Sequence, residues 1–274
     1  MRIATYNLWN AVTNWPQRLA GIAEELCGLD ADIVAAQEAP TQASESMLLA
    51  DYLRGHTQYP HVLHLPCNET PRGEDRPEGL AFLSKLPLTN VQTNWRDGFD
   101  NENSWGARVV IDWNGVSLGV TNVHLDWKHA DSRERHIVNI VREMIDAQPA
   151  DIDILCGDFN DDGGASSLAF LAGSVTLHGY RNQAPWSDLA LEWHTACGET
   201  PPVTLDFEHN PRWKPKQIGG PSKRFDRIYL SARSPDLEPR TAAVGVFGQH
   251  PTKVAGIVPS DHYGLYVDLM PAGS

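Results

Sequence analysis

The stretch IDILCGDFN, residues 152–160, decides the architecture expected for this chain. Its first part, Ile152–Leu155, is a short apolar run that predicts a buried strand, and Asp158 and Asn160 follow where that strand ends. Loops at strand ends are where a rigid scaffold presents its functional groups. A single carboxylate in such a place means little, so the question is whether the pattern recurs.

It recurs along the whole chain. The polar residues that stand at the end or the start of a predicted strand are Asn7, Glu38, His124, Asp226, Asp261 and His262. Hard cations such as Mg²⁺ take oxygen ligands, and Asp, Glu and His also handle protons. The sequence therefore predicts one site, assembled from strand ends, that binds a cation and transfers protons.

The intervening segments predict an α/β protein. Strands are expected at 2–8, 32–37, 227–231, 242–247 and 265–269, with a run of strands separated by turns over 61–126. Asn-Gly in WNGV (113–116) predicts a type I′ hairpin turn. Helices are expected at 14–29, 41–53, 132–147 and 166–171, whereas 178–221 has no clear periodicity. We expect one domain over 1–274, with two stacked mixed sheets flanked by helices.

The net charge of the chain bears on whether it binds duplex DNA. The net charge is −13 over 274 residues, whereas proteins that hold duplex DNA nonspecifically neutralise phosphates with Lys and Arg. One basic cluster stands out, Lys214, Lys216, Lys223 and Arg224, and it is expected to be a solvated loop or to bind a substrate phosphate. No signal peptide pattern and no membrane-spanning apolar stretch is visible, so we expect a cytoplasmic enzyme with no membrane insertion and no obligate protein partner.

Seven stretches resemble the motifs of the endonuclease/exonuclease/phosphatase superfamily, in the family's order and over nearly the whole chain. They are TYNLWN (5–10), AAQEA (35–39), GLAFLSK (79–85), TNVHLD (121–126), GDFN (157–160), FDRIYL (225–230) and PSDHYGLYVDL (259–269). TLDFEHNPR (204–212) is most similar to 5′-tyrosyl-DNA phosphodiesterases, and TYNLWN is more similar to neutral sphingomyelinases. The resemblance implies a four-layer αββα sandwich and hydrolysis of a phosphoester.

The residue types then suggest roles. Glu38, helped by Asn7, is expected to ligate Mg²⁺ or Mn²⁺, which would draw charge from a phosphate oxygen and steady the leaving oxygen. Asp158 is expected to deprotonate the attacking water, and Asn160 to hold the water or the phosphate. Many nucleases of the family have an acid two positions after the first Asn. Trp9 stands there in this chain, which favours a site with one metal ion.

The remaining candidate residues are expected to stabilise the negative charge that builds on the phosphoryl oxygens, directly or by orienting a neighbour. His262 and His124 are expected to donate hydrogen bonds to phosphoryl oxygens, with Asp226 holding His262 in one tautomer. Asp261 would orient a neighbour or touch the metal from the far side. A lone His124 could instead be a structural imidazole inside the core.

Two further interpretations stay open at this point. Arg108 is expected either to clamp a phosphate or to form a plain salt bridge. Large aromatic side chains either line a substrate groove or simply pack, and those in question are Trp127, Trp186, Trp193 and Trp213.

The sequence thus predicts a metal-dependent phosphodiesterase that uses activated water. A blocked or single-stranded DNA end is one expected substrate. A small phosphodiester or a phospholipid head group is the alternative. A non-catalytic binding protein on the same fold is the third hypothesis, and the presence of every core motif residue argues against it.

Overall fold

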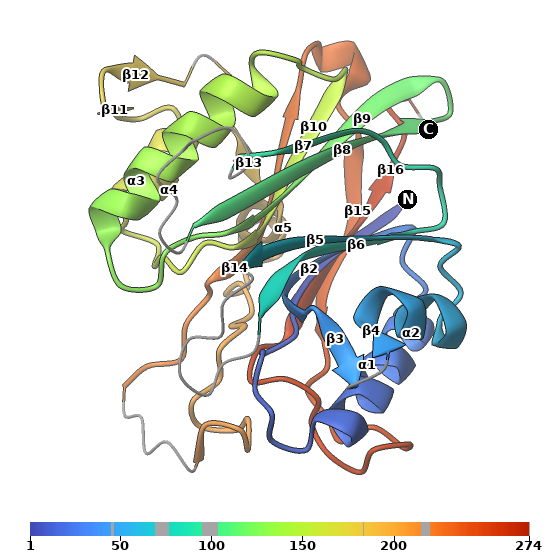
Figure 1. Cartoon of the computed structure of the whole chain (residues 1–274). Helices are drawn as coiled ribbons and strands as arrows, with labels where there is room; N and C mark the ends of the chain where they lie inside the picture. Colours follow the sequence, from blue (N-terminus) through green and yellow to red (C-terminus); the bar gives the residue numbers. More distant parts are fainter. Residues whose placement is uncertain (45–46, 69–76, 95–103, 183, 215–219, 274) are drawn as a thin grey trace.

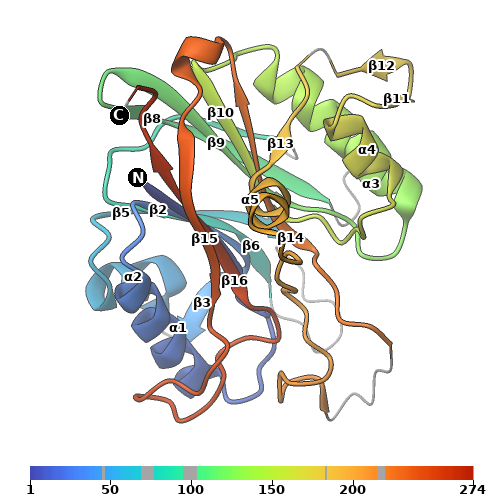
Figure 2. The same cartoon turned by 180° about the vertical axis from the view of Figure 1, so that it is seen from behind.

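The computed structural model describes residues 1–274 except 45–46, 69–76, 95–103, 183, 215–219 and 274. Two six-stranded sheets stack on one another, and helices cover their outer faces (Figures 1 and 2). The four-layer αββα sandwich expected from the sequence is confirmed.

The first sheet has the strand order β15-β16-β1-β2-β6-β5. Its central pair, β1 and β2, is parallel, and the neighbouring pairs are antiparallel. The strand bounds are β1 Arg2–Asn7, β2 Ile33–Pro40, β5 His61–Asn68, β6 Glu78–Ser84, β15 Arg240–Phe247 and β16 Gly264–Met270.

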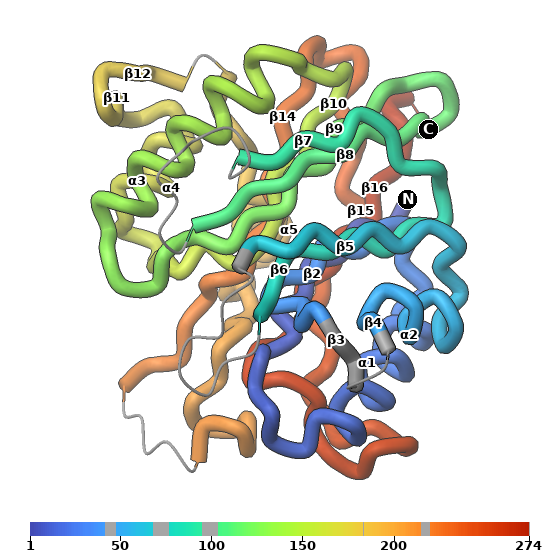
Figure 3. Tube along the Cα trace, in the orientation of Figure 1, coloured from blue at the N-terminus to red at the C-terminus, as the bar shows by residue number. Residues whose placement is uncertain are grey.

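The second sheet has the order β13-β14-β10-β9-β8-β7 and repeats this plan, with β9 and β10 as its parallel pair. Its strands are β7 Thr89–Thr93, β8 Trp105–Trp113, β9 Val116–His124, β10 Ile152–Asp158, β13 Ser187–Asp188 and β14 Asp226–Ala232. The two sheets meet with β6 against β8 and β9, and with β1 against β10 and β14 (Figure 3).

Helices cover both outer faces. On the first sheet lie α1 (Trp15–Leu29) and α2 (Leu49–His56), and on the second lie α3 (Ala130–Asn139), continued by a π-helical segment Ile140–Ile145, and α4 (Ser166–Leu171) (Figure 1). Separate apolar clusters fill the space between the sheets and the space under each helical layer. No helix in the described part of the chain is long and apolar enough to cross a membrane.

Two of the expected helices differ from the structure. The helix expected over 41–53 begins only at Leu49, after two short strands, β3 (Gln42–Ser44) and β4 (Met47–Leu48). Only Leu49 and Leu53 of α2 are buried, so the apolar face of this helix is about one turn long. The helix expected at 132–147 begins at Ala130 and becomes π-helical from Ile140.

The region 178–221 contains a helix that the sequence did not predict, α5 (Leu189–Cys197). Only Leu189 and Ala190 of α5 are buried, so the helix carries no long apolar stripe. Its start is fixed instead by Asp188, whose side chain accepts the N–H of Leu191. The small strands β11 (Thr176–Leu177) and β12 (Tyr180–Arg181) precede it.

The hairpin between β8 and β9 forms as expected. Asn114 has φ 58° and Gly115 has φ 84°, the positive values that a type I′ turn needs at both central positions.

Candidate active site

The carboxyl ends of the two parallel strand pairs bring four of the predicted residues together. In the first sheet β1 ends at Asn7, paired with Gln37 of β2, and Glu38 follows. In the second sheet β9 ends at His124, paired with Asp158 at the end of β10. Parallel strands end at the same edge of a sheet, and the two sheets are stacked, so these ends converge on one pocket.

Two further elements complete the group from the neighbouring antiparallel strands. Asp226 begins β14 directly opposite Asp158. His262 comes two residues before β16, which pairs with β1. The whole expected set of catalytic residues therefore lies at one end of the sandwich.

An irregularity in β2 directs Glu38 into the pocket. The pairing of β2 with β6 shifts register between Ala36 and Ala39, and Glu38 has a left-handed φ of 50°. Such bulges re-aim side chains. Gln37 is buried between the sheets, where its Nε2 donates to Asn122 Oδ1 at 2.7 Å.

This Gln37–Asn122 bond ties the two sheets together directly beneath the site, and Asn122 Nδ2 also donates to the carbonyl of Ala36 at 2.9 Å. Neither residue is among those predicted from the sequence. The available signal was an amide side chain inside an apolar run just before Glu38 and just before His124.

Asn7 holds two carboxylates side by side. Its Nδ2 donates to Glu38 Oε1 and to Asp158 Oδ2, both at 3.0 Å, while its Oδ1 accepts the N–H of Trp9 at 2.9 Å. The Asn7 amide therefore positions Glu38 and Asp158, and its expected part in binding a metal ion stays a prediction.

Glu38 is held at both oxygens, because Oε2 also accepts the N–H of Asn10 at 2.8 Å. Burial by itself would raise the pKa of this carboxyl. The positive field of His124 and the hydrogen bonds from Asn10 and Asn7 outweigh burial, so its pKa lies below the ordinary value. Glu38 is therefore favoured in the charged form, with about a quarter of its side chain (24%) open to the pocket.

Asp158 is nearly inaccessible to solvent, and its pKa is shifted in the opposite direction from that of Glu38. Its Oδ1 accepts the N–H of Asn160 at 2.9 Å, and burial together with the nearby charge of Asp226 raises its pKa. Asn160 has a left-handed φ of 50°, and its Nδ2 donates to the carbonyl of Leu125 at 2.9 Å. The turn after β10 is thus held by hydrogen bonds from Asn160 to Asp158 and to Leu125.

His262 and Asp226 form a buried pair. The distance from His262 Nδ1 to Asp226 Oδ2 is 2.8 Å, and His262 Nε2 lies 3.8 Å from Asp158 Oδ2. Burial opposes the charged imidazolium, but the carboxylates of Asp226, Asp158 and Asp261 outweigh it and raise the pKa of His262 to about 10. An imidazolium donates at both nitrogens, so Nε2 can offer a proton towards the pocket while Nδ1 stays bonded.

His124 faces the same space from the second sheet. Its Nε2 lies 3.9 Å from Glu38 Oε1 and 3.8 Å from Asp158 Oδ2, and its ring edge packs against Trp105. The structure thus places His124 with the other predicted residues. Its catalytic role stays a prediction.

A pocket of about 550 Å³ opens above these groups. Polar and aromatic side chains make up most of its lining, which consists of Trp9, Asn10, Ala11, Glu38, Glu78, His124, Trp127, Asp158, Asn160, Leu205, Phe207, Trp213, Phe225, Asp261 and His262. Of the four tryptophans considered as groove residues, Trp127 and Trp213 line the pocket. Trp186 is buried under the helices of the second sheet, and Trp193 lies on α5.

The other aromatic residues of this wall were not predicted from the sequence to line a groove: Trp9, Phe207 and Phe225. Their signal was weak, because large aromatic residues in irregular segments more often pack against the protein itself. In this chain both happen, since Phe207 packs edge-on against Trp213 at 5.0 Å while both line the pocket.

Arg108 does not join the site. It is 1% exposed and pairs with Asp153 at 2.6 Å inside the second sheet, so its guanidinium is occupied by a buried ion pair and not directed at a phosphate. In the expected basic cluster, Arg224 pairs with Asp188 at 2.8 Å and Lys223 contacts Asp162. Lys214 is exposed, and Lys216 lies outside the described residues.

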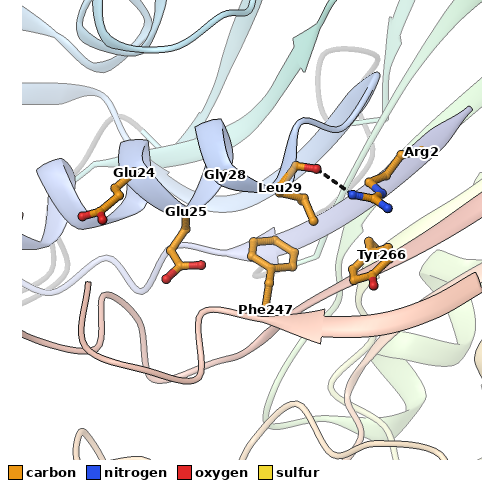
Figure 4. A pocket seen from close by; sticks show the side chains of 7 residues that line it. All are labelled: Arg2, Glu24, Glu25, Gly28, Leu29, Phe247 and Tyr266. Atoms are coloured by element: carbon orange, nitrogen blue, oxygen red, sulfur yellow. Dashed lines mark hydrogen bonds between the residues drawn. The ribbon is translucent and has the colours of Figure 1, made fainter. Parts of the chain in front are cut away.

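A separate recess of about 390 Å³ lies between α1 and the ends of β15 and β16 (Figure 4). Its positive group, Arg2, donates to the carbonyl of Leu29 and forms two hydrogen bonds with Asp268. None of the predicted catalytic residues lines it. The pocket at the strand ends is therefore the candidate active site.

Comparison with known proteins gives a family match. The model of the endonuclease/exonuclease/phosphatase family matches residues 4–262. No curated protein sequence matches the chain significantly.

Three solved structures illustrate the structural likeness. Truncated TDP2 from Caenorhabditis elegans is 19% identical, with 98% of this chain and 97% of that chain covered and a TM-score of 0.71. TDP2 from D. rerio, complexed with a single strand DNA product, is 18% identical, with 98% of each chain covered and a TM-score of 0.73. An endonuclease/exonuclease/phosphatase from Bacteroides vulgatus is 16% identical, with 98% of each chain covered and a TM-score of 0.68. At these identities the likeness shows the fold.

Proposed function

The chain belongs to the endonuclease/exonuclease/phosphatase family, and from that premise we propose that it hydrolyses a phosphodiester with a water molecule activated at Asp158, assisted by a divalent cation bound at Glu38. Members of this family are hydrolytic enzymes. The observation that carries the proposal is the bridging of Glu38 and Asp158 by the amide of Asn7, at 3.0 Å to each, on the floor of one pocket.

The donor groups at the pocket suit a hard cation. Glu38 offers a charged carboxylate whose pKa is held low and whose side chain reaches the pocket. Oxygen donors of this kind favour Mg²⁺ or Mn²⁺ over softer metals. When bound, such a cation supplies Lewis acidity to a phosphoryl oxygen and positive charge near the leaving oxygen.

A second set of donors lies deeper. Atoms of Asp158, Asp226 and His262 come within 4.8 Å of one another, a spacing that could also hold an ion. These three residues are buried, and Asp226 already pairs with His262 Nδ1 at 2.8 Å, whereas the charged Glu38 side chain is 24% exposed and reaches the pocket. Glu38 is therefore the favoured ligand, and Trp9, standing where many relatives have an acid, favours one ion.

Asp158 is suited to take a proton from water. Burial and the charge of Asp226 raise its pKa, which makes it a better general base than an ordinary exposed carboxylate. Its Oδ1 is fixed by Asn160 N–H and its Oδ2 by Asn7. Asn160 itself lines the pocket and has one amide hydrogen beyond the bond to Leu125, which it can direct to the water or the phosphate.

The two histidines act on the phosphoryl oxygens. His262, protonated and oriented by Asp226, donates from Nε2 as negative charge builds in the transition state. His124 donates from the opposite sheet, since its Nε2 faces the same space. Asp261 also lines the pocket and adds negative charge beside His262, which supports the protonated form of that ring.

The aromatic wall indicates what lies beside the scissile phosphate. Trp127 is 66% exposed at the pocket, with Lys128 Nζ 4.6 Å from the centre of its ring, and a planar group of the substrate can stack on this exposed ring. The net charge of −13 disfavours a long contact with duplex DNA. We therefore place a single-stranded or blocked nucleic-acid end ahead of a phospholipid, and the single strand DNA product bound by TDP2 from D. rerio supports that order.

The test is turnover of bis-p-nitrophenyl phosphate by purified protein with Mg²⁺, with Mn²⁺ and with a chelator. The proposal predicts hydrolysis that depends on the cation and is restored when it is added back. Absence of turnover with either cation would favour a non-catalytic binding protein. A single-stranded oligonucleotide, a 5′-tyrosyl oligonucleotide and a choline phosphodiester, compared under the same conditions, would rank the substrate classes.

A further inference from the structure

Arg18 of α1 is a fully buried cation directed at two loops of the active site. Its exposed fraction is 0%. Its guanidinium donates to the carbonyls of Leu8, Trp9 and Ala11 in the loop after β1, and to the carbonyl of Pro259 at 2.6 Å in the loop before β16. The guanidinium carbon also lies 4.3 Å from the centre of the Trp9 ring. One side chain therefore holds loops that are about 250 residues apart in the sequence.

Both loops carry groups that the proposed reaction uses. The first follows Asn7 and presents the N–H of Asn10 to Glu38 Oε2 at 2.8 Å. The second leads into Asp261 and His262. The hydroxyl of Ser260 adds another tie between them, because it donates to the carbonyl of Asn7 at 2.7 Å.

The second loop is also held from its other side. Four consecutive carbonyls, those of residues 258–261, each accept an N–H from a side chain: Arg212 bonds to the first, Arg18 to the second, Asn210 to the third and Trp213 to the fourth. A loop whose carbonyls are all fixed in this way cannot shift without breaking several bonds at once. Of this set, Arg18 donates hydrogen bonds to carbonyls of the first loop as well, and Arg212 approaches that loop at the Trp9 ring, whose centre lies 5.7 Å from its guanidinium carbon.

The guanidinium suits this task for a physical reason. Burying a charge is costly unless its hydrogen-bonding groups are satisfied, and here main-chain carbonyls of both loops accept them. Arg presents donors in a rigid planar fork, whereas Lys presents a point charge on a flexible stem. The fork fixes directions as well as distances, so it sets where one loop lies relative to the other.

We propose that Arg18 is a positioning residue for the active site: it fixes the loop after β1 against the loop before β16, so that Glu38 and His262 face the same phosphate. The inference rests on the proposed function for its catalytic consequence. Arg18 does not line the pocket and lies behind both loops, so its effect passes through the backbone it holds.

The test compares Arg18→Lys, which keeps the charge and loses the fork, with Leu26→Ala as a matched control. Leu26 lies two turns further along α1 and is also 0% exposed, but it packs in the apolar layer under the helix. Misplacing catalytic groups by about an ångström can cost on the order of 10²-fold in rate. We expect Arg18→Lys to lower kcat with Mg²⁺ by roughly 10-fold to 10²-fold, to weaken Mn²⁺ binding measured by calorimetry, and to speed amide hydrogen exchange in peptides covering both loops.

Leu26→Ala should lower the melting temperature at least as much while leaving kcat within about threefold of the wild type. Equal losses of kcat in the two variants, or unchanged exchange in either loop of Arg18→Lys, would overturn the inference. If Arg18→Lys does not fold, Arg18→Gln serves as the second variant. If the wild type hydrolyses no phosphodiester, the proposed function fails, and the exchange rates of the two loops still decide whether Arg18 positions them.

Discussion

Replacing Asp158 by Asn tests whether Asp158 is the general base. Its effect on the stability of the folded protein can be worked out from the hydrogen bonds of the carboxylate. Asp158 accepts two N–H groups, from Asn160 at Oδ1 and from Asn7 at Oδ2. An amide has one oxygen, so in either orientation one of these donors faces an NH₂ group and loses its partner. Losing a hydrogen bond to a charged acceptor costs about 1.5–3 kcal/mol.

An opposing effect offsets much of that cost. The carboxylate of Asp158 is buried beside Asp226, and both circumstances disfavour its charge, which the amide removes. We therefore expect the melting temperature of Asp158→Asn to lie within about 5 °C of the wild type. The rate should fall about 10²-fold to 10⁴-fold, because an amide does not accept the proton of the attacking water.

The assay is steady-state hydrolysis of bis-p-nitrophenyl phosphate at saturating Mg²⁺, with thermal unfolding of the same samples. Asp153→Asn is the control, since Asp153 is also buried but pairs with Arg108 away from the pocket. The control should lose stability and retain its rate within a few-fold. A rate for Asp158→Asn within about threefold of the wild type would remove Asp158 from the role of base.

Three more predictions follow from the same contacts. Glu38→Gln should weaken Mg²⁺ binding, and excess metal should partly restore the rate, whereas unchanged affinity in calorimetry would exclude Glu38 as a ligand. Mg²⁺ at a hundredfold excess over its Kd should stabilise the wild type by about 2.7 kcal/mol and Glu38→Gln by less, and an equal effect of Na⁺ at matched ionic strength would indicate screening alone. Burial raises the pKa of Asp188, but its ion pairs with Arg224 and Arg227 outweigh burial, so the pKa of Asp188 is lowered on folding. The ion pairs therefore stabilise the folded protein above the unfolded-state pKa of about 3.9, and this stabilisation is lost as the pH falls through the folded-state pKa. Urea unfolding should therefore show Asp188→Asn less stable than the wild type at pH 7, with a difference that narrows below about pH 4, and a difference that widens there would contradict the assignment.

The aromatic wall of the pocket gives a prediction about substrate choice. Trp127→Ala should lower kcat/KM about 5-fold to 150-fold for a nucleoside 5′-p-nitrophenyl phosphate, the equivalent of about 1–3 kcal/mol of stacking, and leave methyl p-nitrophenyl phosphate unaffected. Equal losses for both substrates would mean that the ring does not contact a base.

The strand ends were predictable because a buried strand and the polar residue that ends it are adjacent in the sequence. Once two parallel pairs are stacked, Asn7, Glu38, His124 and Asp158 have to meet. The role of Asn7 was less predictable. Its amide orientation depends on Trp9 N–H, a contact that arises from the path of the loop after β1.

Contacts between distant segments left no local signal. Arg108 precedes an apolar strand in the sequence, and its partner Asp153 lies in another strand of the same sheet, so the ion pair exists only once β8, β9 and β10 are assembled. The same holds for Arg18, whose acceptors lie in two loops. Helix α5 escaped detection because it buries little apolar surface.

The most direct test of the central claim is anomalous scattering from crystals soaked with Mn²⁺ and phosphate. We expect a single Mn²⁺ bound to the carboxylate of Glu38, with the phosphate between that ion and the side chains of His124 and His262. Asp158 should lie within hydrogen-bonding distance of a water beside the phosphorus. A manganese peak on Asp158, Asp226 and His262 with none at Glu38 would contradict it.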